Sequence, residues 1–280
     1  KRIMSSSTAV EATTTDELTA FNINGFTLGA NTDVNGTGFN YIGWQWKGGG
    51  TAVSNTSGTI TSSVSANTTA GFSVVTYTGT GANGTIGHGL GAVPSMIIIK
   101  NRQATNSWVV YHVSTGNGNV LLLNSTNAST ADALAWNNTT PTSTVFSVGT
   151  GANADTNQTA GGGQHVAYCF APVSGFSAFG SYTGNGSTDG PFIYTGFRPK
   201  FVFWKNSSTT GDWQMKDSSR STYNVTSANL YANLSTAENS AGDVDFLSNG
   251  FKIRSIGTDV NGSGNTIIYA AFAEIGRAHV

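Results

Sequence analysis

Residues 180–206 read GSYTGNGSTDGPFIYTGFRPKFVFWKN, and residues 75–101 read VTYTGTGANGTIGHGLGAVPSMIIIKN. Each stretch contains a Tyr-Thr-Gly-x-Gly motif, then a glycine-rich segment and a proline, and ends with an apolar run of strand length followed by Lys-Asn. Self-similarity at a fixed interval is the signature of a repeat architecture. The repetition therefore decides the fold, because it indicates that one structural unit occurs more than once in the chain.

The matching positions are separated by one interval of about a hundred residues, the size of a small domain. The interval joins the pairs Tyr77/Tyr182, Gly79/Gly184, Gly81/Gly186, Pro94/Pro199, Lys100/Lys205 and Trp108/Trp213. The apolar segments HVAYCFAP and IIYAAFAE close the two copies. We therefore predict two whole units, residues 71–172 and residues 173–274.

The segment before these units matches the end of the second unit. FNINGFTLGANTDVNGTGFNYIGW, from Phe21, is similar to FLSNGFKIRSIGTDVNGSGNTIIY, from Phe246. We therefore predict that residues 1–47 are the C-terminal part of an incomplete first unit. Residues 48–70 are rich in Gly, Ser, Thr and Asn, which predicts a linker with room for one short strand over residues 59–64.

The last six residues, IGRAHV at 275–280, break the aligned pattern. This hexapeptide is what a common sequencing adapter encodes in one reading frame, and we interpret it as a read-through artefact to be excluded from fold reasoning. Together with a first residue that is not methionine, it predicts a translated metagenomic fragment of a longer protein.

Short segments rich in β-branched and aromatic residues predict strands, and the Asn-Gly pairs between them predict hairpin turns. Helix signals are confined to residues 128–135 and 230–238. Without the alternation of strands and long helices that a parallel sheet requires, the sequence predicts an all-β fold of tandem antiparallel β-sandwich modules, jelly-roll-like in type. Trp108 and Trp213 recur inside strands, which predicts core positions for both.

Composition excludes several classes of partner. Only 10% of the residues are charged and the formal net charge is -1. Since Lys and Arg form no cluster, the electrostatic footprint of a nucleic-acid binder is missing. No apolar run approaches the roughly 20 residues that cross a bilayer, so we expect no membrane insertion. Cys169 is the single cysteine, so no internal disulfide is expected.

We predict no catalytic, metal or cofactor site, and hence no enzyme. His88, His112 and His165 are far apart, and none has a second ligand at metal-binding spacing. A glycosidase needs two carboxyl groups about 5 to 10 Å apart. Asp243 and Asp245 are the best such pair because alternate residues of a strand share a face, but two acids that solvate a strand edge are the simpler interpretation.

If the units bind a ligand, we expect the contacts in turn loops, which tolerate variation on a rigid sheet. Residues 80–89 and 185–190 both follow Tyr-Thr-Gly and are rich in side chains that hydrogen-bond sugar hydroxyls. The candidate contact residues are Asn83, Thr85, His88, Asn185, Ser187, Thr188 and Asp189. Few aromatic rings lie there to stack on a sugar, so each site is expected to be weak. The alternative is that these loops only close hairpins.

The motifs GFSVVTYTGTGANGTIGHGLGAVPSMIIIKNR and GSYTGNGSTDGPFIYTGFRP, with the closing segments FLSNGFKIR and IIYAAFAE, resemble an uncharacterised repeated domain of marine bacteriophages. That domain occurs in long virion proteins of tail or tail-fibre type, and it offers no functional residues to carry over. The resemblance implies a non-catalytic structural or host-recognition repeat located in the virion tail.

The expected partners are a host-surface glycan or protein, bound weakly and multivalently, and other virion tail proteins. A homo-oligomer is an open option, although no heptad repeat supports a trimeric coiled coil. Two alternatives remain: part of a polysaccharide-degrading tailspike, or a bacterial surface adhesin, which would be extracellular or at the cell surface.

Overall fold

The computed structural model describes residues 1–151 and 155–274, and the interpretation of residues 275–280 as an artefact lies outside them. The named strands pair antiparallel, and only short helical turns interrupt them. The predicted all-β class of antiparallel, sandwich-like modules is confirmed. None of the described helices is long and apolar enough to cross a membrane.

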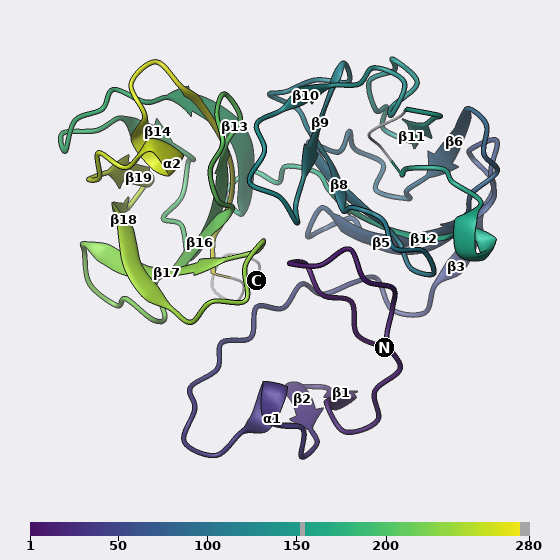
Figure 1. The fold of residues 1–280 in the computed structure, drawn as a ribbon, viewed down its shortest axis with the longest axis horizontal. Helices are drawn as coiled ribbons and strands as arrows, with labels where there is room; N and C mark the ends of the chain where they lie inside the picture. The colour runs from purple at the N-terminus through teal and green to yellow at the C-terminus, as the bar shows by residue number, and fades with distance from the viewer. Residues whose placement is uncertain (152–154, 275–280) are drawn as a thin grey trace.

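The first whole unit is built on an eight-stranded sheet and a separate pair of strands (Figure 1). In spatial order the large sheet contains β10 (Thr130–Ala131), β9 (Asn119–Leu122), β8 (Val109–His112), β7 (Met96–Asn101), β12 (Gln164–Phe170), β5 (Phe72–Thr78), β4 (Ser62–Asn67) and β3 (Val53–Asn55). The pair consists of β11 (Val145–Val148) and β6 (Gly84–Gly87), and a 3-10 turn, η1 (Ala160–Gly162), precedes β12.

The second unit forms one continuous eight-stranded sheet. Its spatial order is β13 (Ser177–Thr183), β20 (Thr266–Phe272), β15 (Phe201–Asn206), β16 (Gln214–Asp217), β17 (Thr226–Tyr231), β18 (Asn239–Leu247), β19 (Gly250–Ile253) and β14 (Phe192–Tyr194), with α2 (Thr258–Asn261) before β20. The sheet curls on itself, because Trp204 of β15 packs in one core with Val244 of β18 and Phe251 of β19. The curled sheet is the sandwich.

Five strands have the same spatial order in the two units. β13, β20, β15, β16 and β17 neighbour one another in the same sequence as β5, β12, β7, β8 and β9. The register also repeats: Lys100 and Asn101 end β7, and Lys205 and Asn206 end β15. The constant interval between matched residues therefore corresponds to matched strands.

The opening residues repeat the end of the second unit on a smaller scale. β1 (Leu18–Asn22) and β2 (Gly25–Leu28) form a hairpin in which Phe21 faces Phe26, as Phe246 faces Phe251 in the hairpin of β18 and β19. α1 (Thr32–Asn35) follows with the same Thr-Asp-Val-Asn sequence as α2. In Figure 1 this hairpin and helix lie apart from the two sheets, joined to them by extended chain.

Residues 48–70, predicted to be a linker with one short strand, instead contribute two strands to the first sheet. β4 pairs along its whole length with β5, and β3 pairs with the outer edge of β4. Val64 points into the core with 3% of its surface exposed. Ser and Thr do not prevent this arrangement, since small hydroxyl and β-branched side chains fit a pleated, half-buried sheet.

A third apolar cluster joins the two units to each other and to the opening residues. It contains Met96 and Trp108 from the first unit and Phe201 and Trp213 from the second, and Trp46 packs against it. Trp108 is 5% exposed and Trp213 is 1% exposed, so the predicted core positions of both are confirmed. The sheets therefore bury one face in their own units and the other face against each other.

Three aromatic rings meet at the centre of this cluster. The ring centroids of Trp46 and Phe170 are 6.1 Å apart, those of Trp46 and Phe272 are 5.5 Å apart, and those of Phe170 and Phe272 are 5.9 Å apart. The sequence alignment places all three at the same position of the closing segment, from three successive repeats. The rings form a nearly equilateral triangle.

We predict that Trp46→Ala lowers the free energy of unfolding by about 2 to 4 kcal/mol, because it removes aromatic pairs and leaves a cavity between the units. Urea unfolding of the full chain measures the change. Phe39→Ala is the matched control, since Phe39 is 73% exposed and its loss should cost less than about 0.5 kcal/mol. Equal effects of the two substitutions would contradict a central role for Trp46.

Candidate functional site

The first candidate loop follows β5 and is held from below by a buried asparagine. Asn157 is 1% exposed and accepts a hydrogen bond on Oδ1 from the Thr80 backbone N–H at 3.0 Å. A Cβ at Gly79 would lie 2.4 Å from the Gln158 carbonyl oxygen, so only glycine fits this close approach. Asn83 is exposed on the same loop. The motif therefore shapes a fixed turn whose tip faces solvent.

The other two candidates of this loop have structural partners. The Thr59 backbone N–H donates to Thr85 Oγ1 at 2.9 Å, and the Thr85 backbone N–H donates to Thr59 Oγ1 at 2.9 Å. His88 is fully buried, with Nε2 3.1 Å from the Thr142 carbonyl oxygen and Nδ1 accepting from the Leu90 backbone N–H. Burial lowers the pKa of His88, which keeps the ring neutral. We therefore leave His88 out of the proposed contact surface.

The second candidate loop is held by an equivalent buried asparagine. Asn261 of α2 is fully buried, and its Oδ1 accepts from the Asn185 backbone N–H at 2.9 Å. Ser187, Thr188 and Asp189 are exposed. Lys252 pairs with Asp189 at 2.7 Å and holds the pKa of that carboxyl below its usual value.

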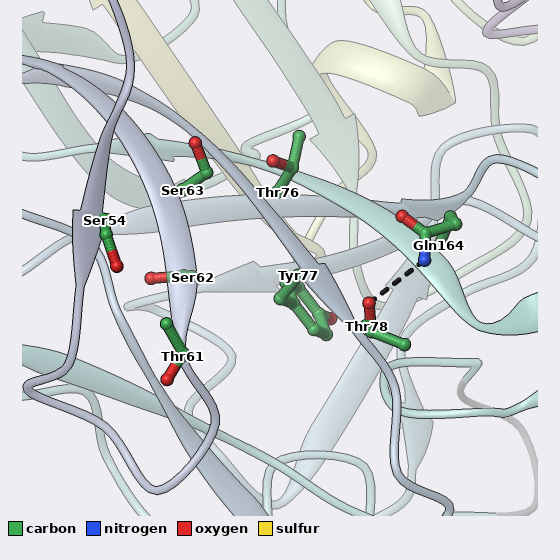
Figure 2. Close-up of a pocket in the computed structure, with 8 residues that line it drawn as sticks. All are labelled: Ser54, Thr61, Ser62, Ser63, Thr76, Tyr77, Thr78 and Gln164. Atoms are coloured by element: carbon green, nitrogen blue, oxygen red, sulfur yellow. Dashed lines mark hydrogen bonds between the residues drawn. The ribbon is translucent and has the colours of Figure 1, made fainter.

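A shallow groove of about 320 Å³ lies beside the first loop, over β3, β4 and β5 (Figure 2). Ser54, Ser63, Thr76 and Thr78 present hydroxyl groups to it, and the Gln164 side-chain amide donates to Thr78 Oγ1 at 3.0 Å. None of the described residues that line the groove has a charged side chain. It offers donors and acceptors to a neutral polar ligand and has no group to move a proton.

The described part of the second unit lacks the two strands that form this groove beside β5. Its strand β13, the counterpart of β5, is the edge of its sheet, whereas β4 and β3 cover β5. Thr183 occupies the position of Thr78 and is exposed. Any ligand site based on this groove therefore belongs to the first unit.

The described residues contain no group of His, Cys, Asp and Glu side chains placed to hold a metal ion. Asp245, one of the two carboxylates considered for glycoside hydrolysis, pairs with Arg254, with Oδ2 2.6 Å from Nε. His165 is buried between backbone oxygens of Gly163 and Asp155, at 2.7 and 3.1 Å. Burial raises the pKa of Cys169 to about 12, so this thiol is not a nucleophile.

Sequence reasoning missed the buried lysines. The Lys205 side chain is fully buried and its Nζ donates to three carbonyl oxygens, those of Asn206 at 3.0 Å, Gly211 at 2.8 Å and Thr126 at 3.0 Å. The first two belong to its own unit, and Thr126 belongs to the first unit. The ammonium therefore crosses the contact between the units.

Lys100 repeats this arrangement one unit earlier. It is fully buried and donates to the carbonyl oxygens of Asn101 at 2.6 Å, Ala104 at 3.1 Å and Thr8 at 3.2 Å. Thr8 belongs to the opening residues, so each lysine binds the segment that precedes its own unit. The Lys-Asn pair at the end of both apolar runs was the available signal, but it is also the ordinary signature of a solvated strand end.

The recurring tryptophans also donate hydrogen bonds to the segment that precedes their own unit. The indole Nε1 of Trp213 donates to the Leu122 carbonyl oxygen at 2.9 Å, and that of Trp108 donates to the Met4 carbonyl oxygen at 3.0 Å. Their recurrence is explained by this contact between successive units and by burial, so neither indole is available to stack on a sugar.

We predict that Lys205→Met changes the pH dependence of stability. Desolvation lowers the pKa of Lys205 to about 8 from 10.5, so the unfolded chain binds more protons between these values. The free energy of unfolding that this group contributes therefore rises by roughly 3 kcal/mol as the pH increases from 8 to 10.5. The same contribution is lost when the pH falls back towards 8.

Urea unfolding at intervals between pH 7 and 10.5 measures this, and Lys205→Met should lack the rise. At pH 7 the variant should be less stable by about 1 to 3 kcal/mol, because it leaves buried carbonyl oxygens unpaired. Parallel curves for the two proteins would contradict the assignment.

His112 makes a second predicted pH effect. It is 1% exposed and its Nε2 lies 3.1 Å from the Tyr269 carbonyl oxygen of the second unit, while burial lowers its pKa to about 4 from 6.5. The stabilising contribution of the neutral ring is present above pH 6.5 and is lost as pH falls towards 4, by roughly 3 kcal/mol. His112→Gln should remove that part of the acid sensitivity, measured as unfolding free energy between pH 4 and 7; an unchanged acid slope would refute it.

These observations define a tandem antiparallel β protein with a hydroxyl-rich groove and with buried lysines that bond across the contacts between its units. The chain belongs to the family described as Domain of unknown function (DUF7483), whose model matches residues 1–275. No curated protein and no solved structure matches the chain.

Proposed function

We propose that this protein is a non-catalytic structural or host-recognition repeat of a phage tail or tail-fibre type virion protein, and that it binds host-surface glycans weakly. The observation that carries the proposal is the chemistry of the exposed polar groups. The groove and both loop tips present hydroxyl and amide groups, and the one charged side chain among the loop candidates, Asp189, is paired with Lys252.

Neutral hydroxyl and amide groups suit the hydroxyl groups of a glycan. Proton-transfer chemistry needs an acid or base with access to the ligand, and the three histidines described above are buried. Binding through few hydrogen bonds and without ring stacking is weak, so useful adhesion depends on many units engaging together. The resemblance to repeated phage virion domains supports this placement in a tail.

The test is a glycan array probed with the full chain, as a monomer and fused to a trimerising helix. We expect signals from the trimerised form and weaker or no signals from the monomer. Thr78→Val removes a groove hydroxyl while keeping the shape of the side chain, and it should reduce the signal at least several-fold. Thr183→Val is the matched control, because it makes the same change on β13, which has no counterparts of β4 and β3 beside it.

A third variant replaces the exposed loop tip, with Thr188→Gly and Asp189→Ser together. Loss of signal here but not in Thr78→Val would move the contact to the second loop. Silence of the trimerised wild-type chain on a broad array, or a signal that none of the variants changes, would refute glycan binding by these surfaces and leave a spacer.

A further inference from the structure

The opening residues carry apolar side chains whose counterparts in the second unit are core residues. Phe21 is 78% exposed, and its counterpart Phe246 is 2% exposed. Tyr41 is 48% exposed, and its counterpart Ile267 is fully buried. The second-unit residues are buried because β13 and β15 pack against them. The opening residues contain the hairpin and helix but not these packing strands.

The buried loop anchor shows the same difference. Asn261 Nδ2 donates to the Ser255 carbonyl oxygen at 2.8 Å, and Asn35 Nδ2 donates to the matching Gly29 carbonyl oxygen at 2.8 Å. Asn261 also binds the loop around Asn185, through bonds of 2.9 and 3.1 Å. Asn35 is exposed, and no such loop binds its side chain among the residues that the structure describes. Asn35 therefore makes the bond that Asn261 forms within its own segment, without the bonds that Asn261 forms to the loop.

Contacts between successive units occur twice with the same pattern. The opening residues accept or donate at Met4, Thr8 and Glu11, and the first unit does so at Leu122, Thr126 and Ser129, one constant interval later. In both contacts the partner unit contributes the tryptophan indole, the lysine Nζ and a backbone carbonyl oxygen, that of Arg102 at 2.7 Å or Ser207 at 3.0 Å. The contact joins two different faces, one from each unit.

The corresponding face of the second unit is open. With Tyr231 at the position of Met4 and Leu122, Ser235 takes the position of Thr8 and Thr126, and Glu238 takes that of Glu11 and Ser129. Residues 234–240 are all exposed, and within the described part of the chain the Ser235 carbonyl oxygen and the Glu238 amide have no hydrogen-bond partner.

The aromatic triangle at the centre of the molecule brings these two exposed surfaces, residues 1–47 and residues 234–240, close to each other. Trp46, Phe170 and Phe272 form a triangle with sides of 6.1, 5.5 and 5.9 Å, so the opening residues hold the third place around the centre. Ser5 Oγ also donates to the Ala232 carbonyl oxygen at 2.7 Å, which brings the opening residues to the open face of the second unit.

We propose that residues 1–47 and 234–240 together form one docking surface for the first four strands of a further unit of this same fold. These strands would carry the Tyr-Thr-Gly-x-Gly turn onto Asn35 and an apolar sheet onto Phe21 and Tyr41. They would also carry a lysine and a backbone carbonyl oxygen onto residues 234–240, and a tryptophan onto Tyr231. Docking completes a ring of three units around the aromatic triangle. The two contacts already present in the chain argue for this occupant, because the third contact repeats both of them.

The test joins a copy of residues 173–227 directly to Lys1. The Leu123 and Ala232 backbone N–H groups bond to the carbonyl oxygens of Trp108 and Trp213, which aligns Tyr231 with Leu122 and hence with Met4, so this junction keeps the strand register. Phe21→Cys is the reporter. Its thiol should react rapidly in the parent chain and about tenfold or more slowly in the extended chain, while the native Cys169 is buried and does not interfere.

Ile23→Cys is the matched control. Ile23 is 99% exposed, and its counterpart Ser248 is exposed in the complete unit, so this thiol should react equally in both chains. Amide hydrogen exchange supplies the second readout, since the Glu238 amide should gain a hydrogen bond and exchange about tenfold or more slowly. A Gly/Ser extension of equal length should change neither measurement.

A second extended chain, with a copy of residues 68–118 joined to Lys1 as its added segment, serves as a second donor of these strands. It keeps the test valid if the first added segment does not fold. Protection of Phe21→Cys and of Glu238 by either donor supports the proposal. If both donors leave the thiol as reactive as Ile23→Cys, the proposal is overturned. It is equally overturned if Phe21→Cys is already protected in the parent chain, because something other than a further unit then covers the surface.

Discussion

Burial of a lysine ammonium between units is the constraint on which the rest of the structure depends. A buried charge is costly unless hydrogen bonds replace its lost water. Lys100 and Lys205 each find two carbonyl oxygens in their own unit and a third on the preceding segment of the chain. Each unit therefore satisfies its own lysine fully only when its neighbour is docked, and folding of the units is coupled.

The apolar contacts between the two units form when the same faces come together. The sheet face that carries Met96 and Trp108 meets the face that carries Phe201 and Trp213, so both faces of each central sheet are buried. An indole bonded to a carbonyl of the neighbouring unit fixes the position of one sheet against the other, which apolar packing alone does not specify. The units therefore pack against each other and are not independent domains joined only by linkers.

Much of the fold could be predicted from the sequence, because repeated strand patterns and turn motifs are local signals. Short β-branched and aromatic segments with Asn-Gly turns between them predicted the antiparallel all-β class, and the recurring Trp108 and Trp213 predicted core positions. The predictions that failed concerned residues whose partners lie far away in the sequence. His88 lies in a glycine-rich stretch typical of exposed loops, yet Thr142 supplies a buried partner from a distant segment. Residues 48–70 look like a linker by composition, but the open edge of β5 recruits them as strands. Lys100 and Lys205 look solvated until the carbonyl oxygens of another unit are in place.

The contact between units also limits what a series of them can build. It joins two different faces, and such a contact gives a closed ring when its rotation divides a full turn and an open filament when it does not. The three aromatic rings at 6.1, 5.5 and 5.9 Å from one another are related by nearly equal steps around a common centre. A rise along an axis would separate successive rings progressively and would not leave the first and third in contact. The observed contact of Trp46 with Phe272 therefore favours closure of this contact at three units.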